Sequence, residues 1–202
     1  MDDGEVERLY GPWLGRTPDD AAMLLADYPG RWWIAGGWAI EAFTHRPRTH
    51  ADIDLSIPRS DVALLHKHLA GRLDVWQADQ GCLRPMLNGD DPIPDTCANL
   101  WLRPSGGDPW EYDVILMDVT DERWVYKRDH RIGLPAEEIL STKDGVSYLR
   151  PEVQLLHKAP GLRAKDQQDF DACLPLLYAA SKGWLHDALS LAHAGHPWLS
   201  EL

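Results

Sequence analysis

The sequence has few cysteines and no long apolar run, and both absences narrow the class of protein. Its 202 residues include three cysteines, Cys82, Cys97 and Cys173, and no Cys-x-x-Cys pair. This number and spacing argue against a disulfide framework and against a zinc site. No apolar stretch approaches the ~18 residues of a membrane span, and the acidic N-terminal segment does not resemble a secretory signal. We therefore expect a cytoplasmic protein that makes no contact with a membrane.

Positive charge is also scarce. Twenty Lys and Arg residues stand against 32 Asp and Glu residues, which gives a net charge of −12. Non-specific binding of long nucleic acid needs a basic face, so the composition disfavours that function. An acidic cleft concentrates cations instead, and this is compatible with a small cationic substrate. The hydrophobic share of 44% is enough for a core, and the ten tryptophans need both burial and partners for their N–H groups.

The hydrophobic pattern of the first two thirds predicts an α+β fold with a small mixed β-sheet and flanking helices. Thr17 and Pro18 begin a helix, since a capping residue precedes proline at the first helical position. Apolar spacing predicts another helix over 59–69. Short apolar runs predict strands, which lie at residues 32–35, 73–77, 98–103 and 110–117.

The last third is different in character. Helices are predicted over 151–160, over 166–180 with a kink at Pro175, and over 184–194. We therefore predict a catalytic domain over residues 1–140 and a helical C-terminal subdomain over residues 141–202.

The most informative segment is AGGWAIEAFTHRPRTHADIDLSIP, residues 35–58. Asp52 and Asp54 lie in an alternating, strand-like run, so their side chains are expected on one face. Two adjacent carboxylates need a cation between them, and Mg²⁺ is usually held by one or two carboxylates together with substrate phosphates. The backbone N–H groups of Gly36 and Gly37 can approach a phosphate closely. The segment therefore predicts a nucleoside triphosphate site.

A third carboxylate is expected from the strand predicted over 110–117. Asp113 is followed by four apolar residues, and Glu111, on the same face, is the alternative. A charged residue in an apolar strand is costly unless it is paired or binds a metal ion. If this strand lies beside Asp52 and Asp54, three carboxylates converge on one or two cations. Two such ions stabilise the attacking and leaving oxygens of a displacement at phosphorus, and Asp113 either binds one ion or takes the proton of the attacking hydroxyl.

The order of Gly-Gly, a short helix, Asp-x-Asp on a strand and a later Asp resembles the nucleotidyltransferase superfamily related to DNA polymerase β. More narrowly, GGWAIEA…RTHADIDL resembles the antibiotic-modifying branch, the aminoglycoside 2″-adenylyltransferases and lincosamide nucleotidyltransferases. The resemblance implies the minimal nucleotidyltransferase fold. It also implies catalytic, metal-binding roles for Asp52, Asp54 and Asp113, and phosphate contacts from Gly36 and Gly37.

The same resemblance implies a basic residue on the C-terminal helices that holds the nucleotide phosphates. Lys158 and Lys165, on either side of a Pro-Gly break, are the candidates. A surface charge near the end of a helix is the alternative interpretation of each lysine.

The expected reaction is the transfer of a nucleoside monophosphate, AMP from ATP, to a hydroxyl of a small, cationic, aminoglycoside-like acceptor. The expected cofactor is Mg²⁺, with two ions, and pyrophosphate is released. Two alternatives stay open: a toxin-type nucleotidyltransferase that modifies tRNA or a protein, and a non-catalytic nucleotide-binding module. The acceptor pocket is expected from residues 73–99 and the C-terminal helices.

Overall fold

The computed structural model describes residues 3–120 and 122–202, and the chain forms two compact units. The first unit comprises the chain up to Ile34 together with Thr49–Met117. The second comprises Ala35–Arg48 and Asp118–Leu202. The chain therefore enters the second unit at Ala35 and returns to the first at Thr49. The proposed functional division at residue 140 does not coincide with these units, and it stays a prediction.

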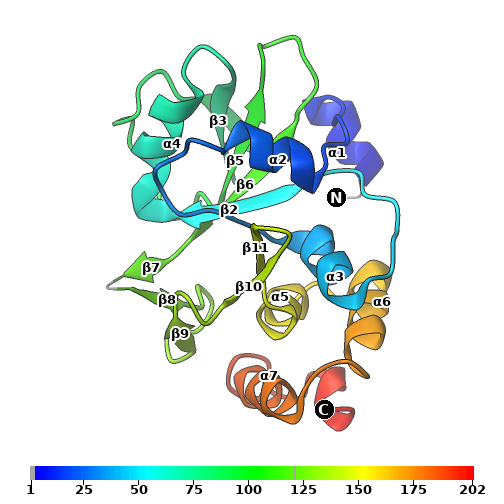
Figure 1. Ribbon diagram of the computed structural model, residues 1–202. Helices are drawn as coiled ribbons and strands as arrows, with labels where there is room; N and C mark the ends of the chain where they lie inside the picture. Colours follow the sequence, from blue (N-terminus) through cyan, green and yellow to red (C-terminus); the bar gives the residue numbers. More distant parts are fainter. Residues whose placement is uncertain (1–2, 121) are drawn as a thin grey trace. The chain divides into compact units, whose positions relative to one another are not determined.

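A mixed sheet lies at the centre of the first unit (Figure 1). Its strands follow the order β1-β2-β6-β5-β3-β4, in which β2 and β6 are parallel and the other neighbours antiparallel. The strands are β1 (Trp33–Ile34), β2 (Asp54–Pro58), β3 (Asp74–Asp79), β4 (Cys82–Pro85), β5 (Asn99–Arg103) and β6 (Tyr112–Met117). The predicted α+β fold with a mixed sheet is confirmed.

The helices of this unit are α1 (Asp3–Tyr10), α2 (Pro18–Leu24) and α4 (Val62–Leu69), with a 3₁₀ turn at Arg59–Asp61. At the start of α2, the Thr17 side chain accepts from the Asp20 N–H and the Asp20 carboxylate accepts from the Thr17 N–H, which is a capping box. The apolar face of α4 is buried beside β3, as its spacing predicts.

Tryptophans account for much of the packing around β3, β5 and β6. The Arg103 guanidinium lies 4.4 Å from the ring centroid of Trp76 and 4.1 Å from that of Trp110. The rings of Trp101 and Trp110 meet edge to face at 5.3 Å. The Trp110 indole N–H donates to the carbonyl of Tyr10 at 2.7 Å. These contacts fix the N-terminal segment on the sheet, because aromatic pairs stabilise packing beyond the area that they bury.

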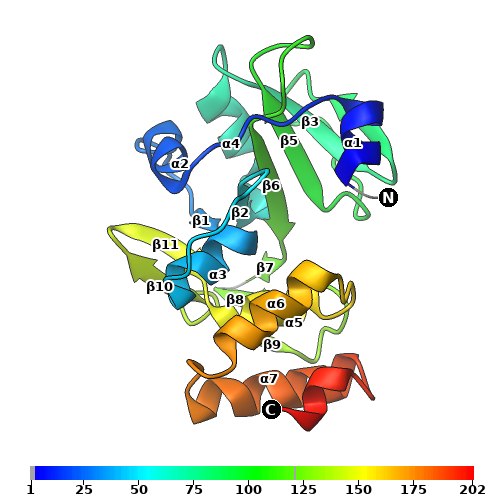
Figure 2. The same ribbon diagram turned by 90° about the vertical axis from the view of Figure 1, so that its right-hand side faces the viewer.

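The second unit is mainly helical, with α5 packed against α3, α6 and α7 (Figure 2). Its helices are α3 (Gly36–Thr44), α5 (Pro151–Lys158), α6 (Ala164–Cys173) and α7 (Ala179–Ala192), followed by a 3₁₀ turn at Pro197–Ser200. Its short strands are β7 (Val119–Thr120), β8 (Arg123–Val125), β9 (Gly133–Pro135), β10 (Leu140–Lys143) and β11 (Val146–Leu149).

The predicted helix over 166–180 is wrong in one respect. The helix α6 ends at Cys173, and Pro175 lies in the connection to α7, because proline removes a backbone donor and clashes with the preceding turn. Within the described ranges, no helix has the length and apolar character needed to cross a bilayer.

Candidate active site

Two carboxylates face each other across the parallel strands β2 and β6. Asp54 and Asp113 are register partners, and the backbone N–H of Asp113 donates to the carbonyl of Ile53 at 3.2 Å. The residues that follow each aspartate continue the same pairing to the ends of both strands. The two strands are therefore neighbours, which is the condition that the sequence left open, and Asp54 and Asp113 lie side by side.

Asp52 lies just before β2, which begins at Asp54 instead of at Asp52 as predicted. Its side chain is exposed, whereas Asp54 and Asp113 are partly buried. Burial, followed by the negative charges of Asp54 and Asp52, holds the pKa of Asp113 well above its ordinary value. The three carboxylates thus interact electrostatically.

The carboxylate pair fits a divalent cation, because a positive ion between like charges relieves the repulsion that raises the pKa of Asp113. In the described part of the chain, no three His, Cys, Asp or Glu side chains are arranged to hold a metal ion by themselves. Mg²⁺ commonly takes one or two carboxylates and completes its shell with phosphate and water oxygens. Asp54 and Asp113, with Asp52 beside them, supply a donor set of that kind.

Glu111, the alternative to Asp113, has a different partner. The Arg16 guanidinium donates to the Glu111 carboxylate at 2.8 Å, and the Glu111 side chain is only 10% exposed. Glu111 also precedes β6, whereas Asp113 lies within it. The register therefore brings Asp113, and not Glu111, to Asp54.

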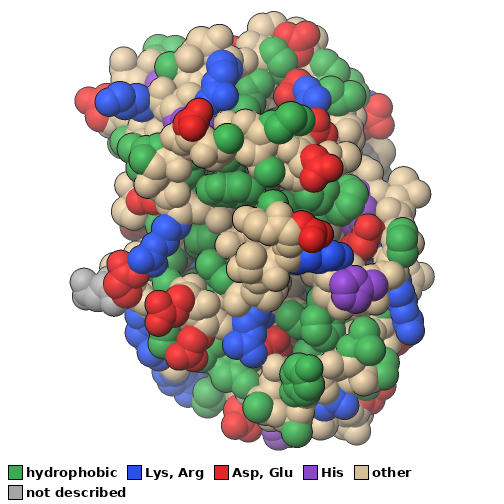
Figure 3. All heavy atoms as spheres, in the orientation of Figure 1, with side chains coloured by type: hydrophobic (Ala, Val, Ile, Leu, Met, Phe, Trp, Pro, Cys, Tyr) green, Lys and Arg blue, Asp and Glu red, His purple; other side chains and the backbone are tan. Residues whose placement is uncertain are grey.

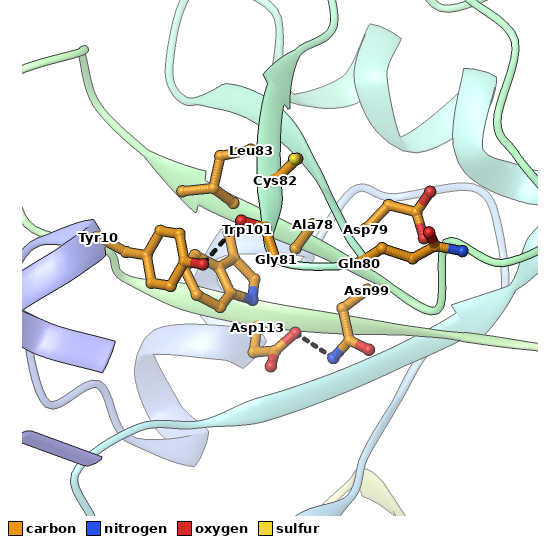
Figure 4. Close-up of a pocket in the computed structure, with 10 residues that line it drawn as sticks. All are labelled: Tyr10, Ala78, Asp79, Gln80, Gly81, Cys82, Leu83, Asn99, Trp101 and Asp113. Atoms are coloured by element: carbon orange, nitrogen blue, oxygen red, sulfur yellow. Dashed lines mark hydrogen bonds between the residues drawn. The ribbon is translucent and has the colours of Figure 1, made fainter. Parts of the chain in front are cut away.

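Asn99 is a site residue that the sequence reasoning missed. It begins β5, and its side-chain N–H donates to Asp113 Oδ1 at 2.7 Å (Figure 4). This hydrogen bond opposes the rise in the pKa of Asp113, because it favours the ionised carboxylate. The available signal was a polar residue at the start of an apolar strand, and that signal is too common to identify a site.

The predicted phosphate turn begins α3 in the second unit. Gly36 has a φ of +63°, which favours glycine. Its N–H donates to the side-chain oxygen of Gln154 in α5 at 2.7 Å, a buried hydrogen bond. Gln154 was not predicted. The structure thus assigns the Gly36 N–H to a bond within the protein, and the phosphate contacts of Gly36 and Gly37 stay predictions.

The two candidate lysines lie in different surroundings. The Lys158 ammonium forms ion pairs with Asp166 at 3.2 Å and Asp169 at 2.9 Å, and its side chain is 8% exposed. Lys165 is exposed in the first turn of α6. The surroundings of Lys158 favour a structural role, and phosphate binding by either lysine stays a prediction.

A pocket of about 230 Å³ lies beside Asp113 in the first unit (Figure 4). Residues 78–83 of the β3–β4 hairpin line it, together with Tyr10, Asn99, Trp101 and Asp113. The Tyr10 hydroxyl donates to the carbonyl of Gly81 at 2.7 Å, which ties α1 to the turn of this hairpin.

Comparison with known proteins gives one family and several similar structures. Residues 20–85 match the aminoglycoside-2″-adenylyltransferase family. The solution structure of the antibiotic-resistance factor ANT(2″)-Ia is 20% identical, with a TM-score of 0.54 over 85% of this chain and 88% of that chain. A crystal structure of ANT(2″)-Ia in complex with adenylyl-2″-tobramycin is 17% identical, with a TM-score of 0.49 over 84% and 92%. The lincomycin-bound lincosamide antibiotic adenylyltransferase LnuA is 14% identical, with a TM-score of 0.49 over 75% and 90%. No curated protein matches the chain.

The fold is thus similar to that of ANT(2″)-Ia, and residues 20–85 are similar to the aminoglycoside-2″-adenylyltransferase family. The match includes the glycine turn and the Asp-x-Asp strand and ends before Asp113. The predicted resemblance to the aminoglycoside 2″-adenylyltransferase branch is confirmed by that match.

Proposed function

We propose that the protein transfers AMP from ATP to a hydroxyl of an aminoglycoside-like antibiotic and releases pyrophosphate, with Mg²⁺ as cofactor. The observation that carries this proposal is the register of Asp54 against Asp113 on adjacent parallel strands. The family match over residues 20–85 supports the adenylyl group and the aminoglycoside acceptor.

The site residues have distinct roles in the proposed reaction. Asp52, Asp54 and Asp113 hold the cation, which supplies positive charge to the phosphate oxygens when it is bound. The acceptor oxygen forms a bond to the α-phosphorus, and the bond between this phosphorus and the oxygen that bridges to the β-phosphorus breaks. Asp113 takes the proton of the acceptor hydroxyl, and Asn99 orients the Asp113 carboxylate for that transfer. Pyrophosphate carries away the electron pair of the broken bond.

Charge favours a small cationic acceptor over tRNA. The net charge is −12, and an acidic surface raises the local concentration of cations. On the face shown in Figure 3, Lys and Arg side chains are interspersed with Asp and Glu side chains. A tRNA-modifying enzyme is expected to present a continuous basic path instead.

Labelled ATP and Mg²⁺ incubated with aminoglycosides, lincosamides and bulk tRNA, in separate reactions, test the proposal. We expect label in an aminoglycoside and an equal amount of pyrophosphate. Asp54→Asn removes one of the two facing carboxylates and is expected to lower kcat at least about a hundredfold, as for a group that stabilises the transition state. Asp27→Asn, an exposed carboxylate in the same unit, is the matched control. Labelling of tRNA alone, or full activity of Asp54→Asn, would contradict the proposal.

A further inference from the structure

Gln154 is a polar side chain among apolar neighbours in the middle of α5. Val153, Leu155 and Leu156 are buried beside it, and Gln154 itself is only 6% exposed. A carboxamide both accepts and donates hydrogen bonds. Within the described part of the chain, the Gln154 side chain forms a single hydrogen bond, in which Oε1 accepts from the Gly36 N–H at 2.7 Å. Buried polar groups are normally satisfied, so the unused donors of this carboxamide indicate a further partner.

The hydrogen bond to Gly36 fixes the orientation of the Gln154 carboxamide. Because the Gly36 N–H is a donor, it faces Oε1, and Nε2 takes the other position. The two atoms of an amide are about 2.2 Å apart, so Nε2 lies within about 5 Å of the Gly36 nitrogen. Nε2 has no acceptor among the described residues, and it is not one of the fully enclosed atoms. Its two hydrogens are therefore available to a ligand at the beginning of α3.

The Gly37 N–H is another donor at the same place. It lies in the first turn of α3, where N–H groups have no acceptor within the helix. The first bond of this helix runs from the Ala39 N–H to the Ala35 carbonyl at 3.2 Å. Gly37 is half-buried, and none of the described residues accepts from its N–H. Donors without acceptors at the positive end of a helix suit an anion, and phosphate oxygens in particular.

The helix α5 also holds this turn in place from both sides. Gln154 and Lys158 are one turn apart and lie on the same side of α5. Gln154 holds Gly36 near the beginning of the first segment of the second unit. Lys158 pairs with Asp169 at 2.9 Å, and Asp169 also pairs at 3.6 Å with Arg48, where that segment ends. A turn that is ordered before the ligand arrives loses less entropy on binding.

We propose that Gln154 is a nucleotide-binding residue. Its Oε1 takes up the Gly36 N–H, and its Nε2 donates to a phosphate oxygen of the triphosphate, beside the Gly37 N–H. The choice of a triphosphate as the anion rests on the proposed function. The Gly36 N–H, which is occupied within the protein, is thus replaced at the phosphate by a donor from α5.

Two variants of nearly the same shape separate this contact from a purely structural role. Gln154→Glu keeps an acceptor for the Gly36 N–H but replaces the Nε2 donors by a negatively charged oxygen. Gln154→Met removes the acceptor and the donors together. If Gln154 only supports the turn, Gln154→Glu binds ATP like the parent and Gln154→Met binds it more weakly. The proposed contact reverses this order.

Calorimetry with ATP and Mg²⁺ at about pH 8, where the introduced carboxylate is ionised, measures the Kd. We expect the Kd to rise about tenfold in Gln154→Met, which loses one hydrogen bond to a charged group. In Gln154→Glu we expect a rise of at least about a hundredfold, because repulsion adds to that loss. Gln168→Glu, at an exposed position of α6, adds the same charge to the same unit and is expected to keep the parent Kd.

A measurement on the unaltered chain does not depend on the folding of any variant. In isotope-labelled protein, the side-chain amide signal of Gln154 is expected to shift when inorganic tripolyphosphate and Mg²⁺ are added, and to stay in place when adenosine is added. A signal that responds to neither addition overturns the inference. If Gln154→Met does not fold, the parent, Gln154→Glu and Gln168→Glu still give the decisive comparison.

Failure of this inference is distinguishable from failure of the proposed function. Transfer of AMP by the parent, together with a parent-like Kd for ATP in Gln154→Glu, overturns the inference and leaves the reaction standing. Binding of ATP with the expected order of variants, but without transfer, supports the contact and contradicts the reaction. A parent chain that does not bind ATP in the presence of Mg²⁺ contradicts both.

Discussion

At the scale of single residues, the pairing of Asp113 with Asn99 is the contact with the clearest consequence for activity. Asn99→Ala removes the donor to Asp113 Oδ1. A hydrogen bond to a charged group contributes about 1.5–3 kcal/mol, so we expect kcat to fall roughly tenfold to a hundredfold. The KM for ATP is expected to change little, because Asn99 orients the carboxylate and does not hold the phosphates.

Steady-state kinetics with saturating aminoglycoside measure this effect. Asn88→Ala, an exposed asparagine in the same unit, is the control. An Asn99→Ala enzyme with the parent kcat would show that Asp113 does not depend on this hydrogen bond for its orientation.

The same pair shows what a sequence can reveal about a site. Aspartates such as Asp54 and Asp113 stand out in apolar strands because a charge there needs a partner. Asn99 and Gln154 do not stand out, since an amide side chain is ordinary at a strand end or in a helix. Their partners, Asp113 and Gly36, lie 14 and 118 positions away, and only the folded chain brings these groups together.

At the scale of elements, Lys158 joins α5 to α6 through its ion pairs with Asp166 and Asp169. Burial would raise the pKa of Asp166, but the hydrogen bonds from Arg163 and the charge of Lys158 keep it below the ordinary value. Lys158→Met removes the cation that the two buried carboxylates share and leaves Arg163 to pair with Asp166 and Arg48 to pair with Asp169. Because these arginines compensate only part of the charge, we expect a loss of about 1–3 kcal/mol in the free energy of unfolding.

Urea denaturation measures this loss, and Lys165→Met provides the exposed control, with an expected change below about 0.5 kcal/mol. If Lys158→Met keeps the parent stability and raises the KM for ATP, then Lys158 binds phosphates, as the resemblance to the superfamily implies. The two measurements therefore distinguish the structural role from the functional one.

Element length decided which parts of the fold could be predicted. The strands β5 and β6 and the helix α4 could be predicted because each is long enough for its pattern of apolar residues to repeat. The strands between Val119 and Leu149 have two to four residues each, too few for a period to be recognised. They depend on pairing with neighbours, and pairing is not visible in a single segment.

At the scale of the whole molecule, the sequence does not reveal that the chain alternates between the two units. Residues 34–57, which carry the family resemblance, cross the unit boundary at Ala35 and again at Thr49. Gly36 and Gly37, which are predicted to contact phosphate, therefore belong to the second unit. Asp52 and Asp54, which are predicted to bind the cation, belong to the first. A division by composition placed one boundary at residue 140, because composition records helical character and not the contacts that define a compact unit.

Stability against acid is a property of the whole fold that one buried histidine influences strongly. His157, in α5, lies among aromatic rings, with centroids 5.3 Å from Tyr126 and 5.8 Å from Trp124. Burial, and then the charge of Arg128, lower its pKa from 6.5 to about 4. Between these two values the unfolded chain binds a proton that the folded chain does not, so stability falls as the pH drops from 6.5 to about 4.

The loss attributable to His157 is on the order of 3 kcal/mol over that interval. His157→Phe removes the proton-binding group and keeps an aromatic ring in the cluster. The variant is therefore expected to lose much less stability between pH 6.5 and pH 4, with a residual slope from His193, whose pKa burial also lowers. Urea midpoints at several pH values measure the slope, and His130→Gln, an exposed histidine, is expected to leave it unchanged. A His157→Phe variant with the parent slope would mean that His157 is protonated in the folded protein, so that the aromatic cluster admits a charge that its burial should exclude.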